Sequence, residues 1–327
     1  MTKQSSAQRP PGEVIGVLLM TFGTAESVED VPRYLAHVRG GAPAPEPLVA
    51  EFQRRFTLVG GSPLIRICGE QAEALEALLN TEPSAHAFFR VAIGMRHSDP
   101  TIAVGVGELV AAGANRILGI VLSPQHSSVV LAGYLRDFES ACAEMPAGIM
   151  TSVAGAWHEE PAFLDALATL THEALDRIPS GDRAGIPVIF SAHSLPRSVA
   201  DRDPAYLDQL QDTARRVAER VGIGPDRWRF SYQSAGHTRE PWLTPDLADV
   251  FPDLRAAGCE QVLIVPVQFV ADHLEVIYDI DVAAREQAEE EGLRLSRTAS
   301  PNATPGFIRA LAAVVQRETV LPMNGDL

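Results

Sequence analysis

Cysteine is scarce in this sequence, and its scarcity excludes two kinds of protein. Only Cys68, Cys142 and Cys259 occur among 327 residues. Such a small, odd and scattered set is unsuited to a disulfide framework. It is also one thiol short of the four that usually hold an iron–sulfur cluster. We therefore expect idle or buried thiols and no cluster.

Long hydrophobic runs and an excess of positive charge are also lacking. No stretch approaches the ~18 consecutive apolar residues of a membrane-spanning helix, and residues 1–13 lack the apolar core of a signal peptide. Lysine and arginine total 27 against 42 aspartates and glutamates, which gives a net charge of −15. This balance argues against nucleic-acid binding and against docking on an anionic membrane. We expect a cytosolic protein, in which a local basic pocket for an acidic small molecule remains compatible with the overall charge.

Two families of catalytic motif are absent as well. Neither G-x-G-x-x-G nor G-x-x-x-x-G-K-[ST] follows the first apolar run, so nucleotide binding has little support. The absence of G-x-S-x-G weakens the case for an α/β-hydrolase.

What is present is an alternation of short apolar runs with helical patterns. The runs have the length and the continuous apolar character of strands buried on both faces. They lie at 14–20, 88–93, 116–122, 186–190, 228–232 and 261–267, with a weaker one at 148–153. Apolar residues at helical spacing predict helices at 68–80, 161–177, 205–220, 272–291 and 304–317. The alternation predicts an α/β protein with parallel sheets and right-handed crossovers.

The two halves of the chain have a similar layout. VIGVLLMTFGT near residue 20 parallels IPVIFSAHSLP near residue 190, and RILGIVLSPQHS parallels QVLIVPVQFVADH. This weak repeat predicts two similar lobes, at 13–160 and 161–303, with a helix in 304–327 that packs back on a lobe. Open parallel sheets bind ligands beyond the carboxyl ends of their strands. Two facing lobes would therefore enclose one cleft.

The segment DHLEVIYDID, residues 272–281, is the most informative of those that follow a strand. If it is helical from its start, Asp272, Glu275 and Asp279 share one face. Like charges at this spacing destabilise a helix unless a cation or a proton compensates them. The segment is thus either a solvated acidic face or part of a site, and its position directly after a buried strand favours a site.

His193 follows a different strand and could face Glu275 across the cleft. A neutral imidazole with a carboxylate suits iron(II), zinc, cobalt or nickel better than calcium. Two protein ligands make an open site, suited to passing a metal on, and the same pair could act as general bases. From the residues alone, these roles and a purely structural histidine all remain open.

Five motifs together resemble the ferrochelatase family over about residues 15–315: LLMTFGT (18–24), GGSPL (60–64), SAHSLP (191–196), PWL (241–243) and VPVQFVADHLEVIYDID (265–281). The resemblance implies an enzyme, a lyase of haem biosynthesis, that inserts iron(II) into a porphyrin and releases two protons. It implies two Rossmann-like lobes around a central porphyrin cleft. It also implies that His193 and Glu275 receive the metal and take up the protons, and that Asp279 extends a polar path. Trp242 would pack near the cleft or in the core of a lobe.

The SAHSLP form and the short, cysteine-poor chain are similar to the branch that acts on coproporphyrin III, which carries four propionates. The resemblance implies porphyrin contacts at Phe22, Arg39, Arg55, Phe56, Ser62 and Tyr134. Phe22 and Phe56 stand where that branch can have tyrosine, and a phenyl ring can stack on a porphyrin but cannot ligate a metal. Where some members carry a further acid, this chain has Ala283. We expect a monomer in which ferrous iron is a substrate and no cofactor is permanently bound.

Several alternatives stay open. The substrate could be protoporphyrin IX, or the protein could be a non-catalytic bilobal carrier of a tetrapyrrole, which would bind without turnover. Cobalt and nickel chelatases share the fold but often have a second histidine where Glu275 stands. A structural metal site is disfavoured because only two ligands are evident.

Overall fold

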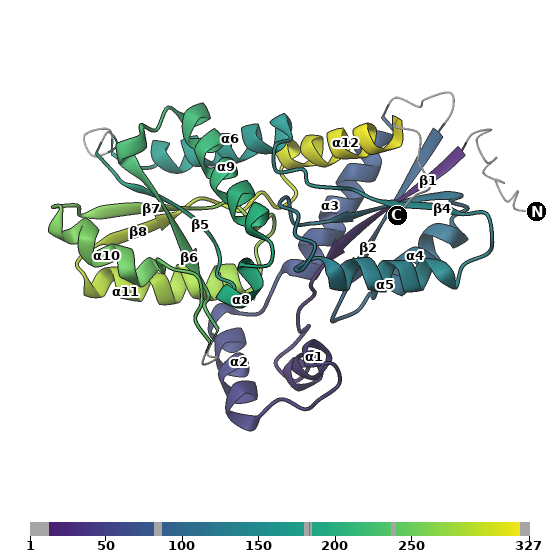
Figure 1. The fold of residues 1–327 in the computed structure, drawn as a ribbon, viewed down its shortest axis with the longest axis horizontal. Coiled ribbons are helices and arrows are strands. Elements are labelled where there is room, and N and C mark those ends of the chain that lie inside the picture. Colours follow the sequence, from purple (N-terminus) through teal and green to yellow (C-terminus); the bar gives the residue numbers. More distant parts are fainter. Residues whose placement is uncertain (1–12, 82–86, 180–182, 184, 237–239, 321–327) are drawn as a thin grey trace, which may run out of the picture.

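A computed structural model describes residues 13–81, 87–179, 183, 185–236 and 240–320. It contains two four-stranded parallel sheets that lie side by side, each with helices packed against it (Figure 1). The strand order is β2-β1-β3-β4 in one sheet and β6-β5-β7-β8 in the other. Within each half the strands follow one another in the same spatial order, which confirms the predicted pair of similar α/β lobes.

The first sheet contains β1 (Glu13–Thr21), β2 (Ala87–Met95), β3 (Arg116–Val121) and β4 (Met150–Val153). Its central strand β1 has six consecutive buried residues, as expected for a strand covered on both faces. The connecting helices are α1 (Val31–Val38), α2 (Glu46–Val59), α3 (Leu64–Leu79), α4 (Ile102–Ala111) and α5 (Ala132–Ala143). Helices α1 and α2 extend away from the sheets on one side of the molecule (Figure 1).

The second sheet contains β5 (Val188–His193), β6 (Trp228–Gln233), β7 (Gln261–Pro266) and β8 (Arg294–Arg297). Its α-helices are α6 (Pro161–Asp176), α8 (Arg197–Ala200), α9 (Pro204–Val221), α10 (Leu247–Ala256), α11 (Arg285–Glu290) and α12 (Pro305–Val320), with a 3₁₀ turn at Pro225–Arg227. The predicted strands are all present. The short strand β8, RLSR, was not predicted because it has a single buried apolar residue.

The segment predicted as one helix over 272–291 differs from the prediction in its winding. Residues Val276–Ala284 form a π-helix, η2, and only then does α11 continue as an α-helix. π-helical turns are rare and are frequent at functional sites. Glu275 immediately precedes this π-helix, and Asp279 lies within it.

The last helix, α12, contacts both α6 and α3, so it joins elements from the two halves of the chain. Trp157, Phe163 and Phe307 form a buried aromatic cluster at this junction, with ring centroids 5.1–6.5 Å apart. The predicted boundaries at residues 160 and 303 stay predictions, because the packing of α6 and α12 crosses them.

Candidate active site

The carboxyl ends of the strands in both lobes open into two adjoining cavities, with volumes of about 670 and 350 Å³. Phe52, His193, Leu274 and Glu275 line both of them. The shared lining places the predicted histidine–glutamate pair at the boundary between the cavities. Ligand sites are commonly concave spaces of ~300–1,000 Å³ with a few convergent polar groups.

His193 is the last residue of β5, and its ring is held from one side. Its Nδ1 lies 2.5 Å from the carbonyl oxygen of Ser194, and its backbone N–H donates to Oε1 of Gln268 at 2.8 Å. A carbonyl can only accept, so Nδ1 carries a proton. Nε2 therefore faces the cleft, where it lies 3.4 Å from Oε2 of Glu275.

The two partners shift each other's protonation. Burial disfavours a charged imidazole, but Glu275 and the Ser194 carbonyl outweigh it and raise the pKa of His193 to about 9. Burial likewise opposes the charged carboxylate, yet His193, followed by His273 and Arg55, lowers the pKa of Glu275 to about 2. At neutral pH the resting pair is an imidazolium and a carboxylate. The Glu275 side chain is still 45% exposed, so solutes in the cleft can reach it.

The smaller cavity is mainly apolar and aromatic. Phe22, Tyr34, Tyr134 and Phe269 line it together with His273. Burial raises the pKa of both tyrosine hydroxyls and lowers the pKa of His273, so these groups are neutral. Such a lining suits a flat apolar ring system.

Phe22 lines the smaller cavity and is 39% exposed. Its ring centroid lies 4.5 Å from that of His97. The next residue, Gly23, has φ +94°, and a Cβ there would lie 2.5 Å from Oγ of Ser98. Only glycine fits this turn comfortably, and the turn presents the ring of Phe22 to the cavity.

The larger cavity is the more polar of the two. Asp279, from the π-helix, lines it, and burial together with the nearby Glu275 raises the pKa of Asp279 to about 6. Arg55 of α2 reaches the same cavity, with Nη1 3.7 Å from Oδ1 of Asp279 and Nε 2.7 Å from Oε1 of Glu51. Its guanidinium also lies 4.7 Å from the ring centroid of Tyr278. The guanidinium of Arg55 thus connects α2 to the π-helix.

The predicted stripe of three carboxylates is wrong in its first member. Glu275 and Asp279 both line the larger cavity, whereas Asp272 precedes the helix and does not share their face. Its carboxylate instead accepts hydrogen bonds from Ser300 Oγ at 2.7 Å and Asn302 Nδ2 at 2.9 Å. The helix begins too late to place Asp272 beside the other two.

The remaining predicted contacts divide into two groups. Trp242 and Tyr134 line the larger and the smaller cavity respectively. Among the residues that the structure describes, Arg39, Phe56 and Ser62 line neither cavity. Arg39 is exposed at the end of α1, Phe56 is buried against α1, and the buried hydroxyl of Ser62 has no protein partner.

Several cavity residues were not predicted from sequence. His273 lies inside the DHLE motif, so its position beside Glu275 was a usable signal. Tyr34 and Phe52 lie on amphipathic helices, where an aromatic residue at apolar spacing ordinarily indicates core. Helix α1 packs on α2, and α2 packs on the π-helix, and this tertiary packing brings the two rings to the cavities.

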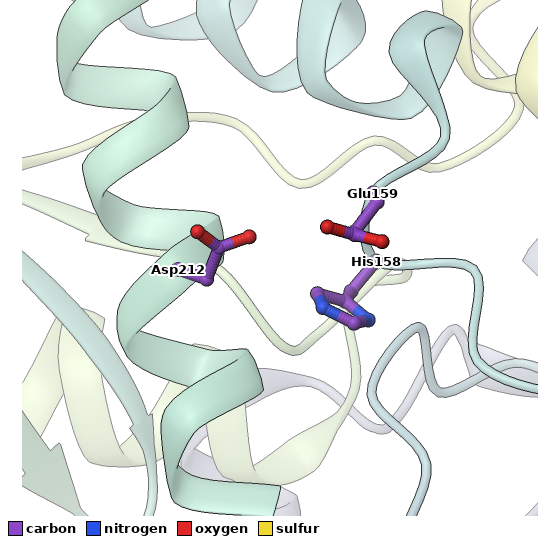
Figure 2. Close-up of side chains that lie close together, drawn as sticks. All are labelled: His158, Glu159 and Asp212. Atoms are coloured by element: carbon purple, nitrogen blue, oxygen red, sulfur yellow. The ribbon is translucent and has the colours of Figure 1, made fainter. Parts of the chain in front are cut away.

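A second group of potential metal ligands lies between the loop before α6 and helix α9. Figure 2 shows His158, Glu159 and Asp212 gathered there, with one ligand atom of each within 4.8 Å of the others. Arg216 already forms ion pairs with both carboxylates, at 2.6 Å to Glu159 and closer to Asp212. The arginine supplies the positive charge that these acids need, so the group is an ion-pair network rather than a metal centre.

Comparison with known proteins places the chain among characterised families. The sequence model described as Ferrochelatase matches residues 14–319. A ferrochelatase of Deinococcus radiodurans is 38% identical over 307 residues, 93% of this chain and 96% of that protein. Coproporphyrin III ferrochelatases of Geobacillus kaustophilus and Bacillus subtilis are 37% and 36% identical, over 92% and 93% of this chain and 94% and 97% of theirs.

Solved structures with low sequence identity share the fold. The sirohydrochlorin chelatase SirB from Bacillus subtilis subspecies spizizenii, in complex with cobalt, has a TM-score of 0.55 at 11% identity, covering 95% of this chain and 97% of that one. CbiX, described as the terminal enzyme of sirohaem biosynthesis in denitrifying bacteria, has a TM-score of 0.53 at 14% identity, covering 93% and 98%. At such identities the likeness concerns the two-lobed chelatase architecture alone.

Proposed function

Because the chain belongs to the ferrochelatase family, we propose that it inserts ferrous iron into coproporphyrin III in haem biosynthesis. The observation that carries the proposal is the His193–Glu275 pair at the boundary of two cavities, one aromatic and one acidic. The aromatic cavity suits the porphyrin ring. The acidic cavity suits a divalent cation and the protons that leave.

Coproporphyrin III is favoured over protoporphyrin IX on two grounds. Relatives that share 35–37% identity over nearly the whole chain are named coproporphyrin III ferrochelatases. The substrate's four propionates also need local cations in a protein of net charge −15. Arg55 lines the larger cavity, and Arg39 is exposed directly after α1, the short helix that packs against α2. We assign propionate contacts to both arginines and ring contacts to Phe22 and Tyr134, which line the smaller cavity. The porphyrin contacts that we assign to Phe56 and Ser62, which line neither cavity, rest on the family resemblance alone.

In the proposed reaction the metal replaces two pyrrole N–H protons. Iron(II) reaches His193 and Glu275, passes to the ring nitrogens, and the two protons transfer to these bases. In the resting pair Nε2 of His193 is already protonated, so that proton has to leave first. An approaching dication disfavours the imidazolium and so promotes this release.

Asp279 gives the protons and the metal a route to solvent. Its carboxyl lies in the same cavity as Glu275, and its pKa of about 6 lets it exchange protons near neutral pH. The family further implies that the porphyrin is bent so that its pyrrole nitrogens tilt out of plane. Such strain would draw on binding energy from the rest of the ring.

The proposal includes no iron–sulfur cluster, because the chain has three cysteines in different parts of the sequence. Ferrous iron is a substrate and not a resident cofactor. None of the helices that the structure describes is long and apolar enough to cross a membrane. We propose a monomer that works in the cytoplasm.

An anaerobic insertion assay tests the proposal. Purified protein is mixed with iron(II) and either coproporphyrin III or protoporphyrin IX, and loss of the free-base absorption spectrum is followed, with Glu275→Gln as the control. Faster insertion into coproporphyrin by the wild type alone is the expected result. Preference for protoporphyrin would keep the reaction and overturn the substrate. Porphyrin binding without insertion would instead support a carrier.

A further inference from the structure

Arg297, at the end of β8, contacts two carboxylates, one that precedes Glu275 in the sequence and one that follows it. Its Nε and Nη2 donate to the two oxygens of Asp281 at 2.8 and 2.7 Å, a bidentate pair. Its Nη1 lies 3.2 Å from Oδ1 of Asp272. The Arg297 side chain is only 12% exposed. Bidentate arginine–carboxylate pairs fix geometry as well as contributing energy.

Arg297, Asp272 and Asp281 together form a clamp, and several further contacts hold Asp272 in it. Arg297 Nη1 also donates to the Thr298 carbonyl at 3.1 Å, and Asp272 accepts from Ser300 Oγ. The backbone N–H of Asp272 donates to Oδ1 of Asn302, whose Nδ2 returns a bond to the carboxylate. Although burial opposes ionisation, Asn302, Ser300 and Arg297 lower the pKa of Asp272, so it stays charged.

The two aspartates of the clamp flank, in the sequence, residues that line the larger cavity. Glu275 and Asp279 both lie between Asp272 and Asp281 in the sequence, and both line the larger cavity. Asp281 lies within the π-helix, whose winding departs from the commoner α-helix. A helix with this unusual winding needs contacts to the rest of the protein that fix its rotation about its own axis. The clamp supplies such contacts at residue 272 and at residue 281, both through one guanidinium.

We propose that Arg297 is a positioning residue, which fixes the rotation of the π-helix through Asp272 and Asp281 and so keeps the Glu275 carboxylate 3.4 Å from His193. This role rests on the proposed function of the His193–Glu275 pair. Arg297 touches neither cavity and acts only through the two aspartates. A misplacement of ~1 Å at a reacting group can cost about 100-fold in rate.

The test compares Arg297→Met, Arg297→Lys and Asp281→Asn with wild type. For each protein we measure kcat for iron(II) insertion, the porphyrin dissociation constant from absorption titration, and the melting temperature. Arg294→Met is the matched control. Arg294 lies on the same strand, but its side chain is 67% exposed and its ion pair with Glu260 is long, at 4.0 Å. Glu275→Gln is measured alongside to test the underlying role of the pair.

The expected result is a split between turnover and binding. Arg297→Met should lower kcat by about 10- to 100-fold, with a porphyrin dissociation constant within about twofold of wild type. Arg297→Lys should recover part of the loss, because an ammonium keeps the charge but not the bidentate geometry. Arg294→Met should match wild type. If Arg297→Met does not fold, Asp281→Asn, which keeps a polar partner of the same shape, provides the same comparison.

Three outcomes would contradict the claims, two of them the positioning role and one the function of the pair. Turnover of Arg297→Met or Asp281→Asn within about twofold of wild type, with Glu275→Gln inactive, would refute the positioning role alone. Equal loss of porphyrin binding and turnover in the folded variants would also refute it, because that pattern reports a general structural defect. Full activity of Glu275→Gln would refute the function assigned to the pair.

Discussion

Nε2 of His193 lies 3.4 Å from Oε2 of Glu275, at the boundary between an aromatic and an acidic cavity. The histidine ends the buried strand β5, and the glutamate immediately precedes the π-helix in the segment that follows the neighbouring strand β7. Each residue is therefore held by the regular structure that precedes or follows it. A porphyrin on one side and a cation on the other would meet at these two side chains.

Removing the imidazole tests its role in proton and metal transfer. We expect His193→Ala to abolish measurable insertion, a loss of at least about 100-fold, because general-base catalysis is worth roughly that much. Porphyrin binding should stay close to wild type, since the aromatic lining is untouched. Stopped-flow loss of the free-base spectrum gives the rate, and absorption titration gives the affinity. Insertion within about tenfold of wild type would refute the catalytic role.

The ion pair makes the titration of His193 and the stability of the fold depend on each other. The folded pKa of about 9 lies above the ordinary value of 6.5. The stabilisation from His193 is therefore complete below pH 6.5 and is lost as the pH rises through about 9. An NMR titration of the imidazole should show its midpoint near 9 in wild type, and a lower midpoint in Glu275→Gln. An unchanged midpoint in the variant would show that Glu275 does not set the protonation of His193.

Most of the fold followed from the sequence because buried parallel strands leave a direct signal. Strands β1, β3, β5 and β7 are continuous apolar runs, and each was predicted within a few residues of its observed bounds. Strand β8 was missed because Leu295 is its single buried apolar residue, which is too little to form an apolar run. The π-helix was missed for a different reason: the same residue types form α- and π-helices, and contacts such as Arg297–Asp281 lie outside the local pattern.

The site was predicted in part for the same reason. His193 ends the buried strand β5 and Glu275 lies in the segment that follows β7, and polar residues beside apolar runs are conspicuous in the sequence. Tyr34 and Phe52 reach the cavities from helices α1 and α2, and neither has a local feature that separates it from a core aromatic. Asp272 was misplaced because spacing alone cannot say where a helix starts.

A substitution of Arg55 tests whether this arginine controls the pKa of Asp279. Its Nη1 lies 3.7 Å from Asp279, and it is one of the groups that favour the charged form of that acid. Arg55→Ala should therefore raise the pKa of Asp279 further above about 6, and weaken binding of a propionate-bearing porphyrin. Arg54→Ala is the control, because Arg54 contacts Glu51 and Tyr278 of the same region. Carboxyl NMR titration and porphyrin affinity should separate the two variants, and identical behaviour would count against a specific role for Arg55.

Phe22 lines the smaller, aromatic cavity, and its phenyl ring cannot ligate a metal. We expect Phe22→Tyr to add an oxygen that can approach the iron of the product, and so to slow product release and change its absorption spectrum. The metal-free porphyrin should bind nearly as before, because both rings stack alike. Product dissociation is measured by transfer to an acceptor protein in excess. Equal release rates and identical product spectra would show that residue 22 does not face the metal.

Trp157 connects the two halves of the molecule, and its removal should destabilise both. The ring is 2% exposed, packs on Phe163 at 5.1 Å and Phe307 at 6.1 Å, and donates from Nε1 to the Val121 carbonyl at 3.2 Å. Trp157→Ala removes this packing and leaves a cavity, which typically costs about 3–5 kcal/mol of unfolding free energy.

Leu58→Ala, at a side chain that is 56% exposed on α2, is the control and should change the free energy by less than about 0.5 kcal/mol. Urea unfolding followed by circular dichroism gives both values. Because the Trp157 cluster joins the loop after β4 to α6 and α12, we further expect the variant to lose iron insertion at a lower urea concentration than wild type. If the variant loses secondary structure and activity at the same, lowered urea concentration, the two lobes unfold as one unit. Activity lost well before secondary structure would show instead that the junction opens first and that the cleft depends on it.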